Sequence, residues 1–303
     1  MDLDTMKYPL QIINYLAHTC LGNDQALNPT VKISLSTVYS ELIYPIVTAP
    51  LPEGKNAPKK RSCYRASGNG IHFVQAYSQN GNNVAEGIYV PITDFYSAMG
   101  YVITATCSPA TLTRNDYYLI LGLFGKWCWT MKAELLAEEV KTVSIIWRVL
   151  PGGQLTPAQY SAREIDTPSI FAISASLPLP KNQKEKARKL RVECLIKYFG
   201  ELRVAPRMKQ LAEDQTGRSV DWGHCAESLA LLCTRLPDSS ELAGTALTVA
   251  KVKTCEPFDI PQSAWLKACD NCVALAEVAK ATYYDHGHQL QQASADAYQA
   301  TWR

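Results

Sequence analysis

The sequence predicts an α/β protein, with a helix–strand–helix unit in its last third and a mixed α+β region before it. Three observations support this prediction. Apolar residues recur at helical spacing in the first 50 residues, and residues 70–106 alternate as strands do around polar turns. An apolar run at 245–252 lies between two stretches with helical patterns. The composition, 47% hydrophobic and 19% charged over 303 residues, is typical of a folded chain.

Residues 1–150 are predicted to form the mixed region, whose role the sequence does not indicate. Leu10, Ile13 and Leu16 fit one face of a helix that ends near Gly22, and a second helix fits residues 38–47. The polar turn at 78–83 lies between two apolar runs and therefore predicts a hairpin.

The rest of this region mixes strand and helix signals. Residues 102–106 are rich in β-branched side chains, which favours a strand. Residues 114–150 follow a helical pattern, most clearly over 131–140.

A boundary is predicted in the Pro- and Ser-rich stretch 151–180, so that residues 151–303 form the second domain. A charged helix follows over 181–199 and stops at Gly200. Leu190, Cys194, Ile196 and Tyr198 are its candidate apolar side.

Charge and termini limit the classes of partner. A net charge of +2 argues against duplex DNA or an anionic membrane, but it leaves a single nucleotide or a short single strand open. The acidic N-terminus does not resemble a signal peptide, and no apolar run approaches the roughly 18–20 residues of a membrane helix. We therefore expect a cytoplasmic or nuclear protein. The basic run 59–61 is either a solvated loop, the reading we favour, or a nuclear-import or phosphate contact.

The cysteines form one pattern that indicates chemistry. Ten cysteines are scattered along a chain without a secretory signal, so reduced, buried thiols are the default expectation. Cys269 and Cys272 form a Cys-x-x-Cys at the start of a predicted helix. Upstream, Cys225-Ala226-Glu227 opens another predicted helix, with the strand 245–252 between the two.

This pattern fits zinc-dependent hydrolytic deamination. When three protein ligands hold Zn²⁺ and its fourth position stays open, the ion lowers the pKa of a water bound there towards roughly 7. Cys225, Cys269 and Cys272 would supply the three thiolates, which helix N-termini stabilise. The reaction also needs a carboxylate that is not a ligand to move protons, and Glu227, two residues beyond Cys225, is the candidate.

These motifs resemble the uncharacterised deaminase-like proteins of fungi within the cytidine-deaminase-like superfamily, over about residues 185–285. The resemblance implies that Cys225, Cys269 and Cys272 bind Zn²⁺ and that Glu227 transfers protons. It also implies paired strands before the first motif, for which residues 143–149 and 170–174 are candidates, and a further strand after the second. Ala268 stands where the family usually has proline, and residues 282–284 are the strand-like stretch after Cys272.

Three functions are left open. The first is a zinc-dependent deaminase acting on a nucleobase, nucleoside or nucleic-acid base. The second is a catalytically inactive zinc protein of the same fold that serves as a binding or interaction module, which the few residues after Cys272 favour. The third is a helical scaffold without a metal.

Other candidate side chains have ordinary explanations. His224 is an alternative fourth ligand, although its position next to Cys225 makes joint chelation awkward. Cys233 and Cys255 are expected to be buried thiols. The pair at His286 and His288 is expected to lie in a solvated segment, and Tyr283 and Tyr284 to pack rather than stack on a base.

Overall fold

A computed structural model gives the fold. It describes residues 8–22, 29–50, 63–64, 71–74, 78–79, 83–84, 89–106, 114–135, 137–149, 171–200, 206, 222–234, 241–256, 259–279 and 281–283. Within these residues no helix has the length and apolarity needed to cross a bilayer. Outside the described residues lie the basic run 59–61 and three other candidates from the sequence, Tyr284, His286 and His288.

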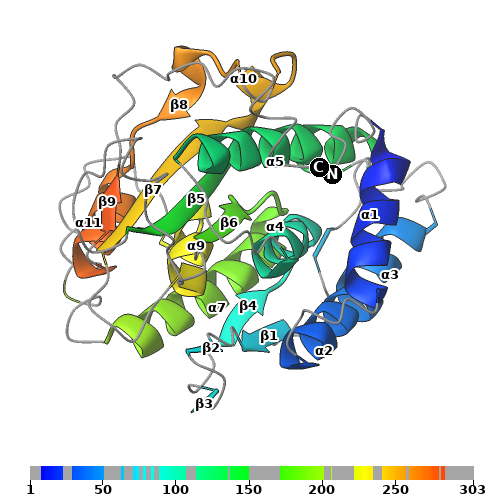
Figure 1. Ribbon diagram of the computed structural model, residues 1–303, viewed down its shortest axis with the longest axis horizontal. Coiled ribbons are helices and arrows are strands. Elements are labelled where there is room, and N and C mark those ends of the chain that lie inside the picture. Colours follow the sequence, from blue (N-terminus) through cyan, green and yellow to red (C-terminus); the bar gives the residue numbers. More distant parts are fainter. Residues whose placement is uncertain are drawn as a thin grey trace.

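A mixed sheet forms the centre of the molecule (Figure 1). β5 (Thr142–Val149) pairs antiparallel with β6 (Phe171–Ala175) on one side and with β7 (Glu241–Thr248) on the other. At the far edge of β7, β8 (Trp265–Leu266) pairs antiparallel and β9 (Ala281–Tyr283) pairs parallel, at different points along the strand. The paired strands and the strand after Cys272 that the sequence predicts are thus confirmed.

Helices cover both faces of this sheet. α5 (Arg114–Glu134) and the short α10 (Val249–Val252) pack on one face, where a Cβ at Gly125 would lie 2.9 Å from Val252. α9 (Ala226–Thr234) packs on the other face, against β5 and β6. α7 (Lys181–Phe199) lies outside α9, and α11 (Asp270–Ala279) contacts α9 and β9.

α4 (Phe95–Thr106) covers the outer edge of β6. The backbone N–H of Ile173 in β6 donates to Thr104 Oγ1 at 3.1 Å, which satisfies a group that an open sheet edge would leave unpaired. A Cβ at Gly100 would lie 2.6 Å from the Ile173 carbonyl oxygen, so glycine allows this close approach.

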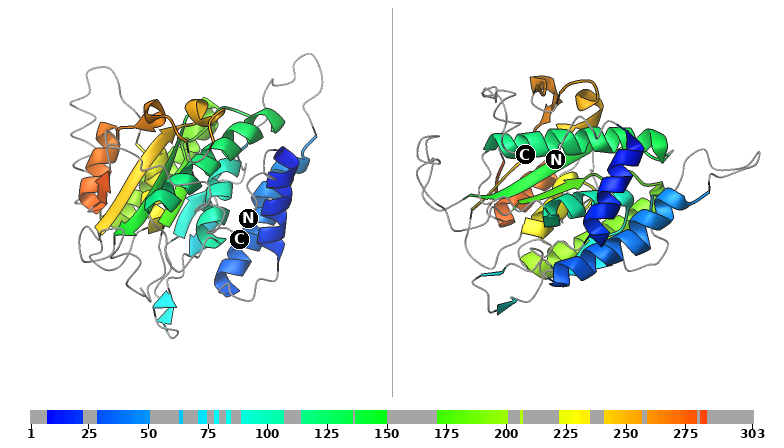
Figure 2. Two further views of the ribbon diagram at one scale, coloured as in Figure 1. Left: turned by 45° about the horizontal axis from the view of Figure 1, so that its top comes forward. Right: turned by 45° about the vertical axis from the view of Figure 1, so that its right-hand side comes forward.

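The first helices of the chain lie beside α4, as the turned views in Figure 2 show. α1 (Pro9–Leu21) buries Ile12, Leu16 and Cys20 and contacts α4 and α5. α2 (Pro29–Val38), the π-helical η2 (Tyr39–Ile43) and α3 (Tyr44–Thr48) follow one another without a break.

β1 (Ile71–Val74) pairs antiparallel with β4 (Tyr89–Ile92), and β2 (Ser78–Gln79) with β3 (Asn83–Val84), which confirms the predicted hairpin. η3 (Gln262–Ala264) precedes β8.

Three sequence-based expectations are wrong in part. Residues 102–106 are the end of helix α4, where Thr106 Oγ1 donates to the Val102 carbonyl as threonines in helices do. The helical pattern over 131–140 ends at Glu134, and residues 142–149 are strand β5. The strand predicted at 245–252 begins at Glu241 and turns into α10 after Thr248. Each corrected segment contains buried residues, such as Val102, Val140 and Val252, and packing there can override local preference.

One hydrophobic cluster extends from Ile12 in α1 to Leu275 in α11. The sheet takes strands from both sides of residue 150, because β5 ends at Val149 and β6 begins at Phe171. The described N-terminal helices therefore share a core with the part of the chain that carries the cysteine motifs.

Candidate metal centre

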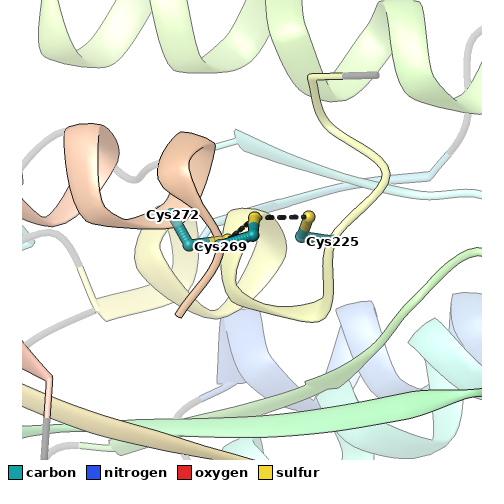
Figure 3. A group of neighbouring side chains, drawn as sticks. All are labelled: Cys225, Cys269 and Cys272. Atoms are coloured by element: carbon teal, nitrogen blue, oxygen red, sulfur yellow. Dashed lines mark hydrogen bonds between the residues drawn. The ribbon is translucent and has the colours of Figure 1, made fainter. Parts of the chain in front are cut away.

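Three cysteines meet where two helices begin (Figure 3). Cys225 immediately precedes α9, and its carbonyl accepts the N–H of Ser228 at 3.3 Å. Cys269 immediately precedes α11, and its carbonyl accepts the N–H of Val273 at 2.9 Å. Cys272 lies in the first turn of α11 and is buried, whereas the other two are partly buried. Both helix N-termini thus direct their positive dipole ends at the thiols.

The spacing of the sulfur atoms fits one tetrahedral metal ion. The three ligand atoms lie within 4.8 Å of one another. Cys225 Sγ is 3.6 Å from Cys269 Sγ, which is 3.4 Å from Cys272 Sγ. Sulfurs bound to Zn²⁺ at about 2.3 Å in a tetrahedron stand about 3.8 Å apart, whereas a disulfide holds them at about 2.05 Å. The three-cysteine group could therefore hold a metal ion, and its all-sulfur donors suit Zn²⁺.

The thiols share their protons unequally. The pKa of Cys269 lies far below its ordinary value because Cys225 and Cys272 hydrogen-bond with its sulfur. The hydrogen bond with Cys269 and burial raise the pKa of Cys225, whereas hydrogen bonds with Cys225 and Cys269, together with burial, raise the pKa of Cys272. The group thus holds one thiolate readily, and a cation is what would allow all three to ionise.

Glu227 lies beside the cysteines, in the first turn of α9, and is 5% exposed. The pKa of its carboxyl is raised from 4.5 to about 7, mainly by burial and further by the charge of Cys269. Hydrogen bonds from its own backbone and from Cys272 oppose this shift. A buried carboxyl with a pKa near neutrality can both accept and donate a proton at physiological pH.

The turn before Cys225 is fixed by contacts with α7. Gly223 has a φ of 78°, and a Cβ there would lie 2.8 Å from the Arg188 carbonyl oxygen. Arg188 Nη1 donates to the Trp222 carbonyl at 3.4 Å. These contacts require glycine at 223, because a side chain would be strained by the backbone and obstructed by α7.

The β6 side holds the other end of this turn. The N–H of Leu177 donates to the His224 carbonyl at 3.3 Å, and Ser174 Oγ donates to the Ala226 carbonyl. Because Ser174 lies in β6, its hydroxyl joins the start of α9 directly to the sheet. Cys225 is therefore held from both sides.

His224 does not belong to the group of metal-ligating atoms found among the described residues. Its ring is partly buried, and its pKa is lowered to about 4 by burial and by the charges of Lys184, Arg191, Lys141 and Arg188. The imidazole is therefore neutral at physiological pH.

The other cysteines in question take no part in the group. Cys233 is buried in the core, as expected, and burial raises its pKa to about 12. Cys255 is partly buried, and its thiol donates to the Val252 carbonyl at 3.3 Å. Tyr283 lies in β9.

Sequence reasoning missed a buried ion pair next to this region. Arg191 in α7 is fully buried and lies 3.8 Å from Asp94, the residue before α4. The fully buried positions of α7 are Ala187, Arg191 and Leu195, whereas Cys194, Ile196 and Tyr198 are partly buried. Ala187, Arg191 and Leu195 are four residues apart, which is the spacing of one helix face. A charged arginine at the middle position concealed that this face is buried.

Comparison of this chain with models of known protein families, with curated proteins and with solved structures finds no match.

Proposed function

We propose that this protein is a zinc-dependent hydrolytic deaminase that acts on a nucleobase-containing substrate. The observation that carries the proposal is the three-cysteine group with the buried carboxyl of Glu227 beside it. A site that only braces the fold gains nothing from a buried acid, which costs free energy to bury. Zinc sites that only stabilise a fold also tend to have four protein ligands, whereas three leave a position for water.

The arrangement of the elements supports the same proposal. The resemblance to cytidine-deaminase-like proteins implies paired strands, a helix opened by Cys-x-Glu, a strand and a helix opened by Cys-x-x-Cys. Here β5 and β6 pair before α9, β7 precedes α11, and β9 lies parallel to β7 after it.

In this mechanism Cys225, Cys269 and Cys272 would hold the ion, whose chemistry would be to activate water as a nucleophile at neutral pH. Glu227 would take a proton from the water and deliver it to the ring nitrogen of the base. The same carboxyl would then take the remaining proton of that water and deliver it to the exocyclic amine, which leaves as ammonia while the oxygen of the water forms the ring carbonyl. A carboxyl pKa of about 7 suits both transfers.

A panel of free bases, nucleosides, nucleotides and single strands, assayed for ammonia release, tests the proposal. Glu227→Gln should lower turnover by about 10²–10⁴-fold and leave the zinc content unchanged. Glu277→Gln on the exposed side of α11 is the matched control, and its turnover should equal that of the wild type. Turnover that survives Glu227→Gln refutes the assigned role.

A zinc-binding interaction module without turnover is the second candidate, and surface side chains favour it. Leu10 and Ile33 of the N-terminal helices are 66% and 69% exposed. Large exposed apolar side chains on neighbouring helices are a feature of protein-binding surfaces. This candidate requires bound zinc but no ammonia release from any member of the panel, so the same assay separates the two functions.

A further inference from the structure

The sulfur atoms of the three-cysteine group lie close enough together to bond with one another as well as with a metal ion. Cys269 Sγ is 3.6 Å from Cys225 Sγ and 3.4 Å from Cys272 Sγ (Figure 3). The cysteines that the structure describes are free thiols. Sulfurs in contact need only approach to about 2.05 Å to form a disulfide. The same three residues can therefore take a metal-bound form or an oxidised form.

Access to solvent distinguishes the three thiols. Cys225 and Cys269 are partly buried, whereas Cys272 is 0% exposed. A small oxidant attacks the thiols that it can reach, so Cys225 and Cys269 are the two sulfurs of the group open to it. Whichever of these is oxidised first, the other is the accessible thiol in contact with it. A disulfide between Cys269 and Cys272 would instead have to form at the fully buried sulfur.

The backbone positions of Cys225 and Cys269 favour a bond between them. Cys225 precedes α9 and Cys269 precedes α11, so each lies just outside a helix. α9 and α11 contact each other. The fold has thus already closed the loop between the two cysteines, and the disulfide forms without a further entropic cost of bringing its ends together.

We propose that Cys225 and Cys269 are an oxidation site for peroxides, which convert the pair to a disulfide in the metal-free protein. Hydrogen peroxide gives one oxygen to the sulfur of one cysteine, its O–O bond breaks, and water leaves behind a sulfenic acid. The sulfur of the other cysteine then attacks the oxidised sulfur, so that the S–S bond forms and the S–O bond breaks. A second water leaves with the proton of the attacking thiol. In total two thiols lose two electrons and two protons, and one peroxide becomes two waters.

The disulfide and the metal compete for the same sulfur atoms. Oxidation consumes two of the three candidate ligands and leaves Cys272 as the remaining thiol of the group. One thiol does not complete a zinc site, so the oxidised protein should not bind the ion. Bound zinc should in turn protect the cysteines, because a ligand that binds one form stabilises it against the other. This inference goes beyond the deaminase proposal, since it requires the cysteine group but no particular substrate.

Peptide mapping of the full chain tests the inference. Protein freed of metal by a chelator is treated with hydrogen peroxide, its remaining thiols are alkylated, and it is digested with trypsin under non-reducing conditions. Cleavage after lysine and arginine places Cys225 in peptide 219–235 and the Cys-x-x-Cys in peptide 268–280. We expect the two peptides joined by a disulfide to be at least about tenfold more abundant than peptide 268–280 closed on itself.

Substitutions identify the cysteines that form the link. Cys225→Ser should abolish the joined peptides, whereas Cys272→Ser should retain them, because it removes the buried sulfur alone. Cys233→Ala is the matched control, since Cys233 also lies in peptide 219–235 but is buried in the core, and it should retain the link. Cys255, which donates to a backbone carbonyl, should remain alkylated in peptide 254–267.

A second arm follows the metal. Zinc-loaded protein should form the joined peptides at least about tenfold more slowly than metal-free protein. Zinc, detected with a chromogenic chelator, should be released in step with the link, and a dithiol reductant should restore zinc binding.

Three results would overturn the inference: peptide 268–280 closed on itself as the main product, joined peptides that persist in Cys225→Ser, or full oxidation of the pair while zinc stays bound. Failure of the deaminase proposal would appear separately, as zinc-loaded protein that releases no ammonia, and it would leave the peptide map unchanged.

Discussion

Arg191 and Asp94 form an ion pair, 3.8 Å between Nη2 and Oδ2, in which both side chains are buried. Ser97 lies between them: its hydroxyl accepts from Arg191 Nη2 at 2.9 Å and donates to Asp94 Oδ2 at 2.5 Å. Asp94 also caps α4, since Oδ1 accepts the N–H of Ser97 at 3.0 Å. The pair therefore joins α4 of the N-terminal region to α7, the helix beside the candidate metal centre.

Removing one partner of this pair should be costly. Arg191→Met leaves the Asp94 carboxylate buried without its cation, and we expect the free energy of unfolding to fall by about 3–5 kcal/mol. Urea denaturation measures this change. Lys189→Met, on the exposed side of the same helix, should cost less than about 0.5 kcal/mol. The double variant Arg191→Met with Asp94→Asn should lose less than the sum of the two single variants. Additive losses would show that the pair is not coupled.

Among the cysteines that the structure describes, the metal content should depend on Cys225, Cys269 and Cys272 alone. Serine at Cys225, Cys269 or Cys272 removes one thiolate ligand, and we expect zinc to fall from about one ion per chain to less than about 0.2. Metal analysis of purified protein, expressed with zinc supplied, measures the content. Cys255→Ser is the matched control, because that thiol is also partly buried but donates to a backbone carbonyl. Loss of zinc in the control would argue against the assigned ligands.

Comparing alanine variants of two glycines with positive φ, Gly200 and Gly223, distinguishes the cost of backbone strain from the cost of contact with α7. Alanine at Gly200, where φ is 85° and nothing lies within 4 Å of the added Cβ, should cost about 1 kcal/mol in unfolding free energy. Alanine at Gly223 adds a 2.8 Å approach to the Arg188 carbonyl, so it should cost at least about 1 kcal/mol more. Gly223→Ala should also weaken zinc binding, because it displaces the turn that holds Cys225. Equal zinc affinity in the two variants would contradict this role of the turn.

Glu227 should give the metal-free protein a specific dependence on pH. Its pKa rises from 4.5 to about 7 on folding, so the folded state binds the extra proton between these values. The stability that it contributes is present below about pH 4.5 and is lost as the pH rises through about 7. The stability of wild type relative to Glu227→Gln should thus fall by about 3 kcal/mol between these pH values. A constant difference in unfolding free energy, measured in the presence of a chelator, would refute the shift.

The most accurate sequence predictions concern local patterns. The helix predicted over 181–199 has these bounds in the structure, and Gly200 follows with the φ of 85° that favours glycine. Helices were predicted correctly after Cys225 and from Asp270 on. The strand predicted at 102–106 was wrong, since its β-branched residues belong to a helix that is buried against β6.

The sequence by itself determined which residues compose the candidate metal centre, because Cys225 and Glu227 share one helical turn and so do Cys269 and Cys272. Only the tertiary structure decided that the two motifs, 44 residues apart, bring Cys225 and Cys269 to 3.6 Å. It also decided that Arg191 is buried on Asp94 and that Arg188 contacts the turn before Cys225. The physical reason is that helix signals act over a few residues, whereas burial and charge proximity depend on packing between segments far apart in the chain.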